Sequence, residues 1–167
     1  ETEDVPDSLL DTVSKRIGDS EEARASRTLP VAFYSAYKNT PLEFAPALQR
    51  AANASLSAVP ALKGRTLVLL DTSGSMHAVL SERSSLTRQD AANVFAAALA
   101  IRGENVRVVA FAENAKDIRV DTRDLLRATE AMPSSYGGTY TDRAIEYAYA
   151  NGETYDRVII LTDEQTS

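Results

Sequence analysis

The amino-acid sequence predicts an α/β fold, a doubly wound and mostly parallel sheet, preceded by an all-helical segment. Before position 60, apolar residues recur at the three- and four-residue steps of helices. After position 64, short apolar runs alternate with helical stretches, which is typical of parallel strands joined by right-handed crossovers. The hydrophobic period changes near Pro60–Gly64. We therefore expect two domains, residues 1–63 and residues 64–167.

The first domain is predicted to be helical throughout. Its first helix has an apolar face, formed by Leu9, Leu10, Val13 and Ile17. Gly18 ends this helix, and Asp19 or Ser20 can cap the second one. Pro30 suits the first position of a third helix, where a missing N–H costs nothing. An apolar stripe over residues 42–59 predicts the fourth helix.

The second domain contains predicted strands at residues 66–70, 106–111, 117–120 and 157–161. The first is a continuous apolar run, as expected of a strand covered on both faces, and the third is a short edge strand. Between the first two strands, the capping box Thr87-x-x-Asp90 opens a helix that ends near Gly103, with Val94 and Phe95 facing inward. Further helices are predicted near residues 124–130 and 142–150. This arrangement is Rossmann-like.

Composition excludes several classes of site and partner. Lys and Arg number 18 against 24 Asp and Glu, so the net charge of −6 argues against a free-standing, charge-driven nucleic-acid binder, and we expect no DNA partner. Without cysteine there are no disulfides or thiolate zinc sites, and one histidine excludes multi-histidine metal sites. No apolar run approaches the ~20 residues that cross a bilayer, and no targeting segment is visible. We expect a cytoplasmic protein without membrane contact.

Three polar segments are predicted to meet at one edge of the sheet. Asp71-x-Ser73-x-Ser75 follows the first strand, Asp163 follows the fourth, and Thr139 lies in a Gly-Gly-Thr loop between them. Ligands of a doubly wound sheet bind beyond the carboxyl ends of its strands. Hydroxyl and carboxylate oxygens are the ligands that Mg²⁺, Mn²⁺ and Ca²⁺ prefer. We expect a divalent-cation site, Mg²⁺ foremost, whose neutral hydroxyls leave the cation able to bind an external carboxylate.

The residues alone leave two alternatives open. Asp71 or Ser73 can simply cap the following loop, as short polar side chains often do. Thr141 competes with Thr139 as a ligand, because the loop carries two neighbouring hydroxyls. An enzyme is not expected, because there is no phosphate-binding Gly-Lys-Thr/Ser loop, no nucleophile elbow around Ser75 and no base near either serine.

The set Asp71-Thr72-Ser73-Gly74-Ser75, Gly138-Thr139 and Thr162-Asp163 resembles the metal-ion-dependent adhesion site (MIDAS) of von Willebrand factor A (vWA) domains. This resemblance implies that Ser73, Ser75 and Thr139 approach the cation, directly or through water. It also implies that Asp71 and Asp163 act largely through bound waters. An Asp or Glu of a partner protein would complete the octahedron.

The junction between the two domains resembles a more specific family. Residues 27–37, 47–60 and 64–71, in this order, are similar to the C-terminal part of a TROVE module joined to a vWA domain, as in bacterial relatives of the Ro sixty-kilodalton autoantigen. The resemblance begins at about Val5. It implies that residues 1–63 are the last helices of a helical-repeat ring, which the vWA domain closes. In this family the ring holds the 3′ end of misfolded non-coding RNA in its hole and Y RNA on its outer surface.

The resemblance therefore implies a fragment of a ribonucleoprotein component. Its complete ring would bind structured non-coding RNA, Y-like or misfolded, and its vWA domain would carry a MIDAS for an acidic ligand. No residue of this chain is assigned an RNA contact. Because few residues follow Asp163, we expect the vWA domain to be truncated after its fourth strand. The alternative is a metal-dependent protein–protein interaction module with no RNA role.

Overall fold

The computed structural model describes residues 7–25, 28–57 and 60–164. The chain forms two compact units, residues 1–60 and residues 61–167, and each is described by itself. Val5, Arg27 and Val59, which belong to predictions made above, lie outside the described residues. No helix in the described part of the chain is long and apolar enough to cross a membrane.

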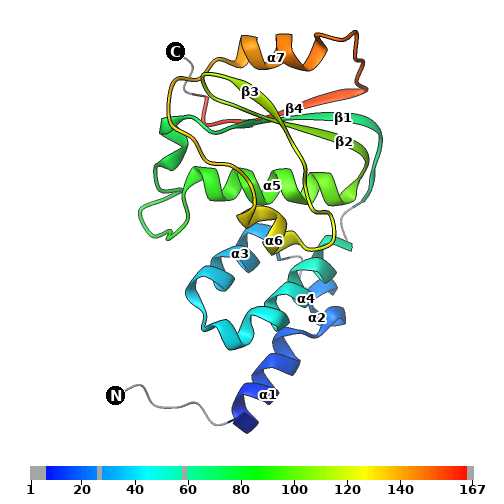
Figure 1. Ribbon diagram of the computed structural model, residues 1–167. Helices are drawn as coiled ribbons and strands as arrows, with labels where there is room; N and C mark the ends of the chain where they lie inside the picture. Colours follow the sequence, from blue (N-terminus) through cyan, green and yellow to red (C-terminus); the bar gives the residue numbers. More distant parts are fainter. Residues whose placement is uncertain (1–6, 26–27, 58–59, 165–167) are drawn as a thin grey trace. The chain divides into compact units, whose positions relative to one another are not determined.

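The first unit is helical, as predicted. Its elements are α1 (Asp7–Ile17), α2 (Ser20–Ala25), α3 (Pro30–Asn39), the 3₁₀ helix η1 (Leu42–Phe44) and α4 (Ala45–Ser57) (Figure 1). α4 contacts the other three α-helices. Ala51 and Ala54 of α4 form a buried cluster with Ala23, and Phe33 packs against it. The small side chains allow the helices to approach closely, so this unit is built around α4.

The prediction of one helix over residues 42–59 was wrong at its start. Leu42–Phe44 is a 3₁₀ turn, and the α-helix begins at Ala45. Pro46 explains the break, because it has no N–H to donate to the Leu42 carbonyl in a continuous α-helix, whereas the first helical turn needs no such donor. Leu42 is consequently 82% exposed instead of extending the apolar stripe.

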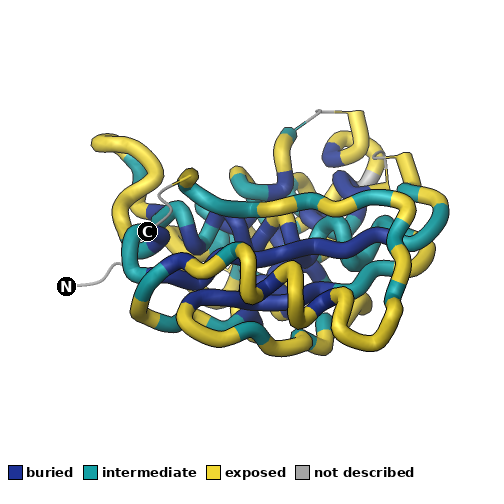
Figure 2. The backbone as a smooth tube through the Cα atoms, turned by 90° about the horizontal axis from the view of Figure 1, so that it is seen from above, coloured by how far each residue is buried: buried dark blue, intermediate teal, exposed yellow. Residues whose placement is uncertain are grey.

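The second unit contains a four-stranded sheet of β1 (Leu62–Asp71), β2 (Gly103–Phe111), β3 (Ala115–Ile118) and β4 (Arg157–Leu161), in the order β3-β2-β1-β4. β1 runs parallel to both β2 and β4, and β3 pairs antiparallel with β2. Residues 66–71 of β1 are buried (Figure 2). The mostly parallel sheet is thereby confirmed. Its short edge strand is also present, but it spans residues 115–118 instead of the predicted 117–120.

Helices cover both faces of this sheet, which makes it doubly wound. α5 (Arg88–Arg102) and α6 (Leu125–Glu130) lie on one face, and α7 (Thr141–Tyr149) lies on the other (Figure 1). The predicted capping box opens α5, where Thr87 Oγ1 accepts the Asp90 N–H at 3.0 Å and Asp90 Oδ2 accepts the Thr87 N–H at 2.8 Å. Val94 is buried as expected, but Phe95 is 40% exposed, because small residues such as Ala96 form the buried face of α5.

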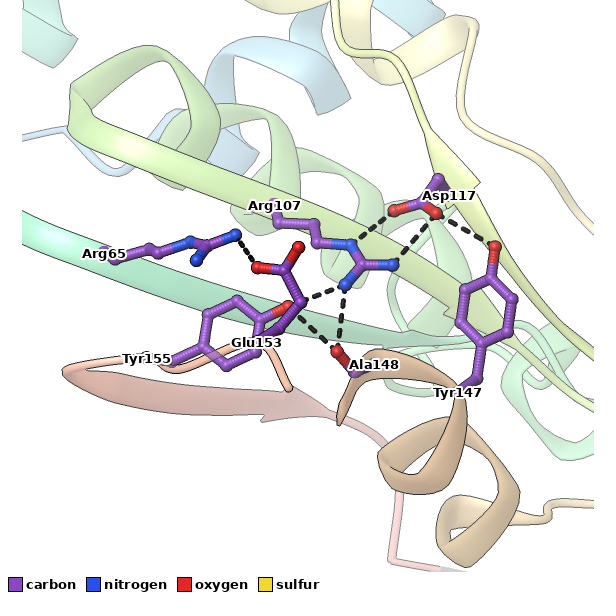
Figure 3. Close-up of polar contacts among 7 residues, drawn as sticks. All are labelled: Arg65, Arg107, Asp117, Tyr147, Ala148, Glu153 and Tyr155. Atoms are coloured by element: carbon purple, nitrogen blue, oxygen red, sulfur yellow. Dashed lines mark hydrogen bonds and ion pairs between the residues drawn. The ribbon is translucent and has the colours of Figure 1, made fainter. Parts of the chain in front are cut away.

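A polar network ties the last turn of α7 to the sheet (Figure 3). From β2, Arg107 donates Nε and Nη2 to the two carboxylate oxygens of Asp117 on β3, at 2.6 and 3.0 Å. Tyr147 donates its hydroxyl to Asp117 at 2.9 Å. Arg107 Nη1 donates to the Ala148 carbonyl at 3.0 Å and to the Tyr155 hydroxyl at 2.7 Å. α7 directly follows the Gly-Gly-Thr loop, so this network holds in place the helix into which that loop leads.

Gly64 shapes the beginning of β1. Its φ of 77° lies in the left-handed region, and the pairing of β1 with β2 shifts register between Leu62 and Arg65. The Gly64 N–H donates to the Glu104 carboxylate at 2.8 Å, and the Arg65 N–H donates to Asp156 Oδ2 at 2.6 Å. A Cβ on Gly64 would collide with that Asp156 carboxylate. Glycine is therefore required here for both conformation and space.

Gly64→Ala should lower the free energy of unfolding by about 2–3 kcal/mol, because it adds left-handed strain and displaces a hydrogen-bonded carboxylate. Gly152→Ala is the matched control: its φ is 68°, but nothing lies within 4 Å of its added Cβ. We expect a loss of about 1 kcal/mol there. Urea unfolding of both variants measures the difference, and equal losses would contradict the role of Asp156.

Asp117→Asn should make folding less sensitive to acid. The hydrogen bonds from Arg107, assisted by the Tyr147 hydroxyl, hold the pKa of Asp117 below its usual value of 3.8. Its contribution to stability is therefore complete above pH 3.8 and disappears as the pH falls through the lower, folded-state pKa. Asp117 is half exposed, so the fall in Tm between pH 7 and pH 2 should differ between wild type and variant by only about 2–4 °C. Tyr147→Phe, which removes one hydrogen bond to Asp117, should have a smaller effect. Superimposable curves of Tm against pH for wild type and Asp117→Asn would contradict the role of Asp117.

Candidate metal centre

The parallel pairing of β1 with β4 brings two of the predicted carboxylates to one edge of the sheet. The register pairs Leu70 with Leu161, so Asp71 and Asp163 follow neighbouring strand ends. Asp71 is fully buried, and the side chain of Asp163 is 5% exposed. Two acidic groups at this depth require hydrogen-bond donors or positive charge around them.

The carboxylate of Asp71 organises the turn that leaves β1. Its Oδ1 accepts the Ser73 N–H at 2.8 Å, and its Oδ2 accepts the Thr162 hydroxyl at 2.7 Å. Asp71 therefore joins the end of β1 to the end of β4. The role of Thr162 as its partner was not foreseen from the sequence.

The two serine hydroxyls lie next to each other in front of this turn. Ser73 Oγ and Ser75 Oγ are 3.4 Å apart, and Ser75 donates to Asp163 Oδ1 at 3.2 Å. Ser73 is buried, and Ser75 is half-buried at the start of the 3₁₀ helix η2 (Gly74–His77). The structure thus brings together Asp71, Ser73, Ser75 and Asp163.

The Gly-Gly-Thr loop lies against the serine turn. The Gly74 N–H donates to the Gly137 carbonyl at 3.2 Å, and the hydroxyls of Thr72 and Ser135 are 2.8 Å apart. Thr139, two residues beyond this contact, is 6% exposed, whereas Thr141 is half-buried and opens α7. The assignment of either hydroxyl as a metal ligand stays a prediction.

His77 has a structural role that its loop position did not indicate. Its Nε2 lies 2.7 Å from the Ser135 carbonyl oxygen, and its ring stacks on Tyr136 at 4.3 Å between centroids and 17° between planes. A carbonyl can only accept, so we assign the proton of this contact to Nε2. His77 holds the Gly-Gly-Thr loop in place and is not directed at either serine as a base.

Arg88 is a charged side chain at this edge that sequence reasoning missed. Its Nη1 donates to Asp163 Oδ2 at 2.5 Å. The sequence did contain a signal for it: Arg88 is a cation in the first turn of a helix, where its charge is unfavourable next to the positive end of the helix dipole. Such an arginine suggests an acidic partner elsewhere in the fold.

This donor set fits a hard divalent cation. Among the described residues no group of three or more His, Cys, Asp or Glu side chains gathers into a metal site. Any ion here would therefore be held by hydroxyls, two carboxylates and water, which suits Mg²⁺ or Mn²⁺ and gives zinc or copper no soft ligand. Ser73, Ser75 and the two aspartates are the residues that would hold it.

The chain is similar to one known protein family and to a solved structure. The family model of the Ro60 vWA domain matches residues 65–167, more than half of the chain. Among solved structures, the crystal structure of the Ro (RSR) protein of Deinococcus radiodurans is similar, with a TM-score of 0.74 and 22% sequence identity. The match covers 96% of this chain and 36% of that chain, and at this identity it shows the fold. No curated protein matches the sequence.

The family match includes the whole sheet from Arg65 onward and all three polar segments of the candidate site. The structural match extends over the preceding helices as well and agrees with the vWA-type fold. The chain belongs to the Ro60 vWA domain family.

Proposed function

We propose that this chain is part of a ribonucleoprotein component whose vWA domain holds a divalent cation and uses it to bind an acidic group of a partner protein. Mg²⁺ is the foremost candidate, with Mn²⁺ and Ca²⁺ as alternatives. The proposal rests on one observation. In this member of the Ro60 vWA family, four oxygen-bearing side chains lie together at one edge of the sheet: Asp71, Ser73, Ser75 and Asp163.

The chemistry of the cluster supports binding over catalysis. Neutral hydroxyls next to the cation neutralise little of its charge, so the cation keeps a strong attraction for a further carboxylate. Asp71 accepts the Ser73 backbone N–H and the Thr162 hydroxyl, and His77 lies against the Ser135 carbonyl, so neither is placed to activate a serine. Asp163 accepts the Ser75 hydroxyl, but its other oxygen is ion-paired with Arg88. We therefore propose a binding site and no enzymatic activity.

The RNA part of the proposal rests on the family and concerns the longer protein. This chain covers 36% of the Deinococcus Ro chain, and its net charge is −6. A helical-repeat ring completed by further sequence would hold structured non-coding RNA, Y-like or misfolded. The acidic, cysteine-free composition supports a cytoplasmic location.

The net charge of −6 favours one second candidate, a metal-dependent protein–protein interaction module with no RNA role. Crosslinking of the full-length protein in cells separates the two. Recovery of structured RNAs with free 3′ ends supports the ribonucleoprotein, whereas recovery of acidic protein partners alone, lost in EDTA, supports the second candidate.

Asp71→Asn should weaken Mg²⁺ binding by at least about tenfold, because it removes one of the two carboxylates at the site. It also replaces one accepting oxygen by an NH₂ donor, so either the Ser73 N–H or the Thr162 hydroxyl loses its acceptor. Calorimetric titration with Mg²⁺ measures the change. Asp121→Asn is the matched control, since Asp121 is an exposed carboxylate paired with Arg123 and remote from the cluster. Equal affinity in wild type and Asp71→Asn would overturn the metal site.

Thr139→Val and Thr141→Val, measured in the same titration, should separate the two candidate hydroxyls. Valine keeps the β-branched shape of threonine and lacks its hydroxyl oxygen. We expect Thr139→Val to weaken Mg²⁺ binding several-fold and Thr141→Val to leave it unchanged. The reverse result would assign the metal ligand to Thr141, the first residue of α7.

A further inference from the structure

Asp163 is a nearly buried carboxylate whose two oxygens are both engaged. Ser75 donates to Oδ1 at 3.2 Å, and Arg88 donates to Oδ2 at 2.5 Å. Only 5% of its side chain is exposed, so an ionised Asp163 needs compensating charge. Arg88 supplies that charge.

Arg88 is placed for more than the stability of α5. It is the first residue of α5, where its charge opposes the helix dipole. Its side chain is 35% exposed, and within the described part of the chain Asp163 engages one of its five N–H donors. Arg88 and Asp163 also line one groove of about 330 Å³, whose other walls are mainly apolar side chains such as Met76 and Leu80, so both residues border the same open space.

We propose that Arg88 competes with the divalent cation for Asp163 and, once the cation has replaced it there, binds the external carboxylate beside the cation. This inference rests on the proposed metal site. It makes the site a two-point receptor, in which a cation and a guanidinium hold one acidic group.

Electrostatics gives the expected direction of each step. A guanidinium within hydrogen-bond distance of Asp163 repels a divalent ion that binds the same carboxylate, so Arg88 lowers the affinity for the cation. When the cation takes over Asp163, the planar fork of Arg88 is released, and such a fork matches a carboxylate with two parallel hydrogen bonds. Arg88 therefore disfavours the metal in the absence of a ligand and favours the ligand in the presence of the metal.

The first experiment titrates Mg²⁺ into the wild-type protein, Arg88→Gln and Arg83→Gln by calorimetry. Arg83→Gln is the matched control, because it removes the same charge from an exposed position in the neighbouring loop. We expect Arg88→Gln to bind Mg²⁺ about tenfold more tightly than wild type, and Arg83→Gln to stay within about twofold. Equal affinities of wild type and Arg88→Gln overturn the competition.

Thermal unfolding separates competition from a purely structural role. In EDTA, Arg88→Gln should lower Tm by a few degrees, because Asp163 loses its partner. Saturating Mg²⁺ should remove that deficit, so the Mg²⁺-induced rise in Tm should be larger in Arg88→Gln than in wild type. A deficit that persists unchanged in Mg²⁺ means that Arg88 is only a structural partner, and overturns the proposal.

Acetate is the probe for the second step. The Nε–Hε resonance of Arg88 should shift when acetate is added in saturating Mg²⁺ and should stay in place when acetate is added in EDTA. Arg88→Lys keeps the charge without the fork, so it should bind Mg²⁺ as wild type does and acetate several-fold more weakly. An acetate shift that is independent of Mg²⁺ overturns the transfer of Arg88 to the ligand.

Failure of this inference differs from failure of the proposed function. If wild type, Arg88→Gln and Arg88→Lys all fail to bind Mg²⁺ at millimolar concentration, the metal site itself is wrong, and the inference falls with it. If wild type binds Mg²⁺ and only the difference between variants is missing, the metal site stands and Arg88 has no part in it.

Discussion

The rest of the site depends on the hydrogen bonds that the buried carboxylate of Asp71 accepts. It accepts the Ser73 N–H from its own turn and the Thr162 hydroxyl from the neighbouring strand end. These two hydrogen bonds hold the serine turn and the end of β4 together. A charged group that is fully buried persists only where donors surround it, so the fold around Asp71 must keep this arrangement.

The electrostatic character of the site follows from where positive charge can be placed. Asp71 is compensated by neutral donors, whereas Asp163 is compensated by the guanidinium of Arg88. The two aspartates are therefore not equivalent, although both follow parallel strands and both are nearly buried. Asp71 organises the backbone, and Asp163 is the carboxylate whose partner, in our proposal, a cation replaces.

The sequence was sufficient for the sheet and for the position of its polar edge, because both depend on local patterns. A continuous apolar run marked β1, predominantly apolar runs marked β2 and β4, and the rule that sites lie at strand ends located the three polar segments. The break at Pro46 was a local signal that the apolar stripe concealed. The partners of Arg88 and His77 could not be predicted, because they lie 75 and 58 residues away along the chain. Only the folded topology brings such partners together.

The Gly-Gly-Thr loop is restrained at both of its ends. At one end, Ser135 is bonded to Thr72 and His77. At the other, the Tyr140 N–H donates to the Ala112 carbonyl at 3.2 Å, and the helix α7 that follows is tied at its last turn to β2 and β3 through Arg107 (Figure 3). A loop fixed in this way has little conformational entropy left to lose when it meets an ion. An ion that binds Thr139, as we propose, would therefore find this residue already positioned, and its affinity would reflect mainly the exchange of water for protein oxygens.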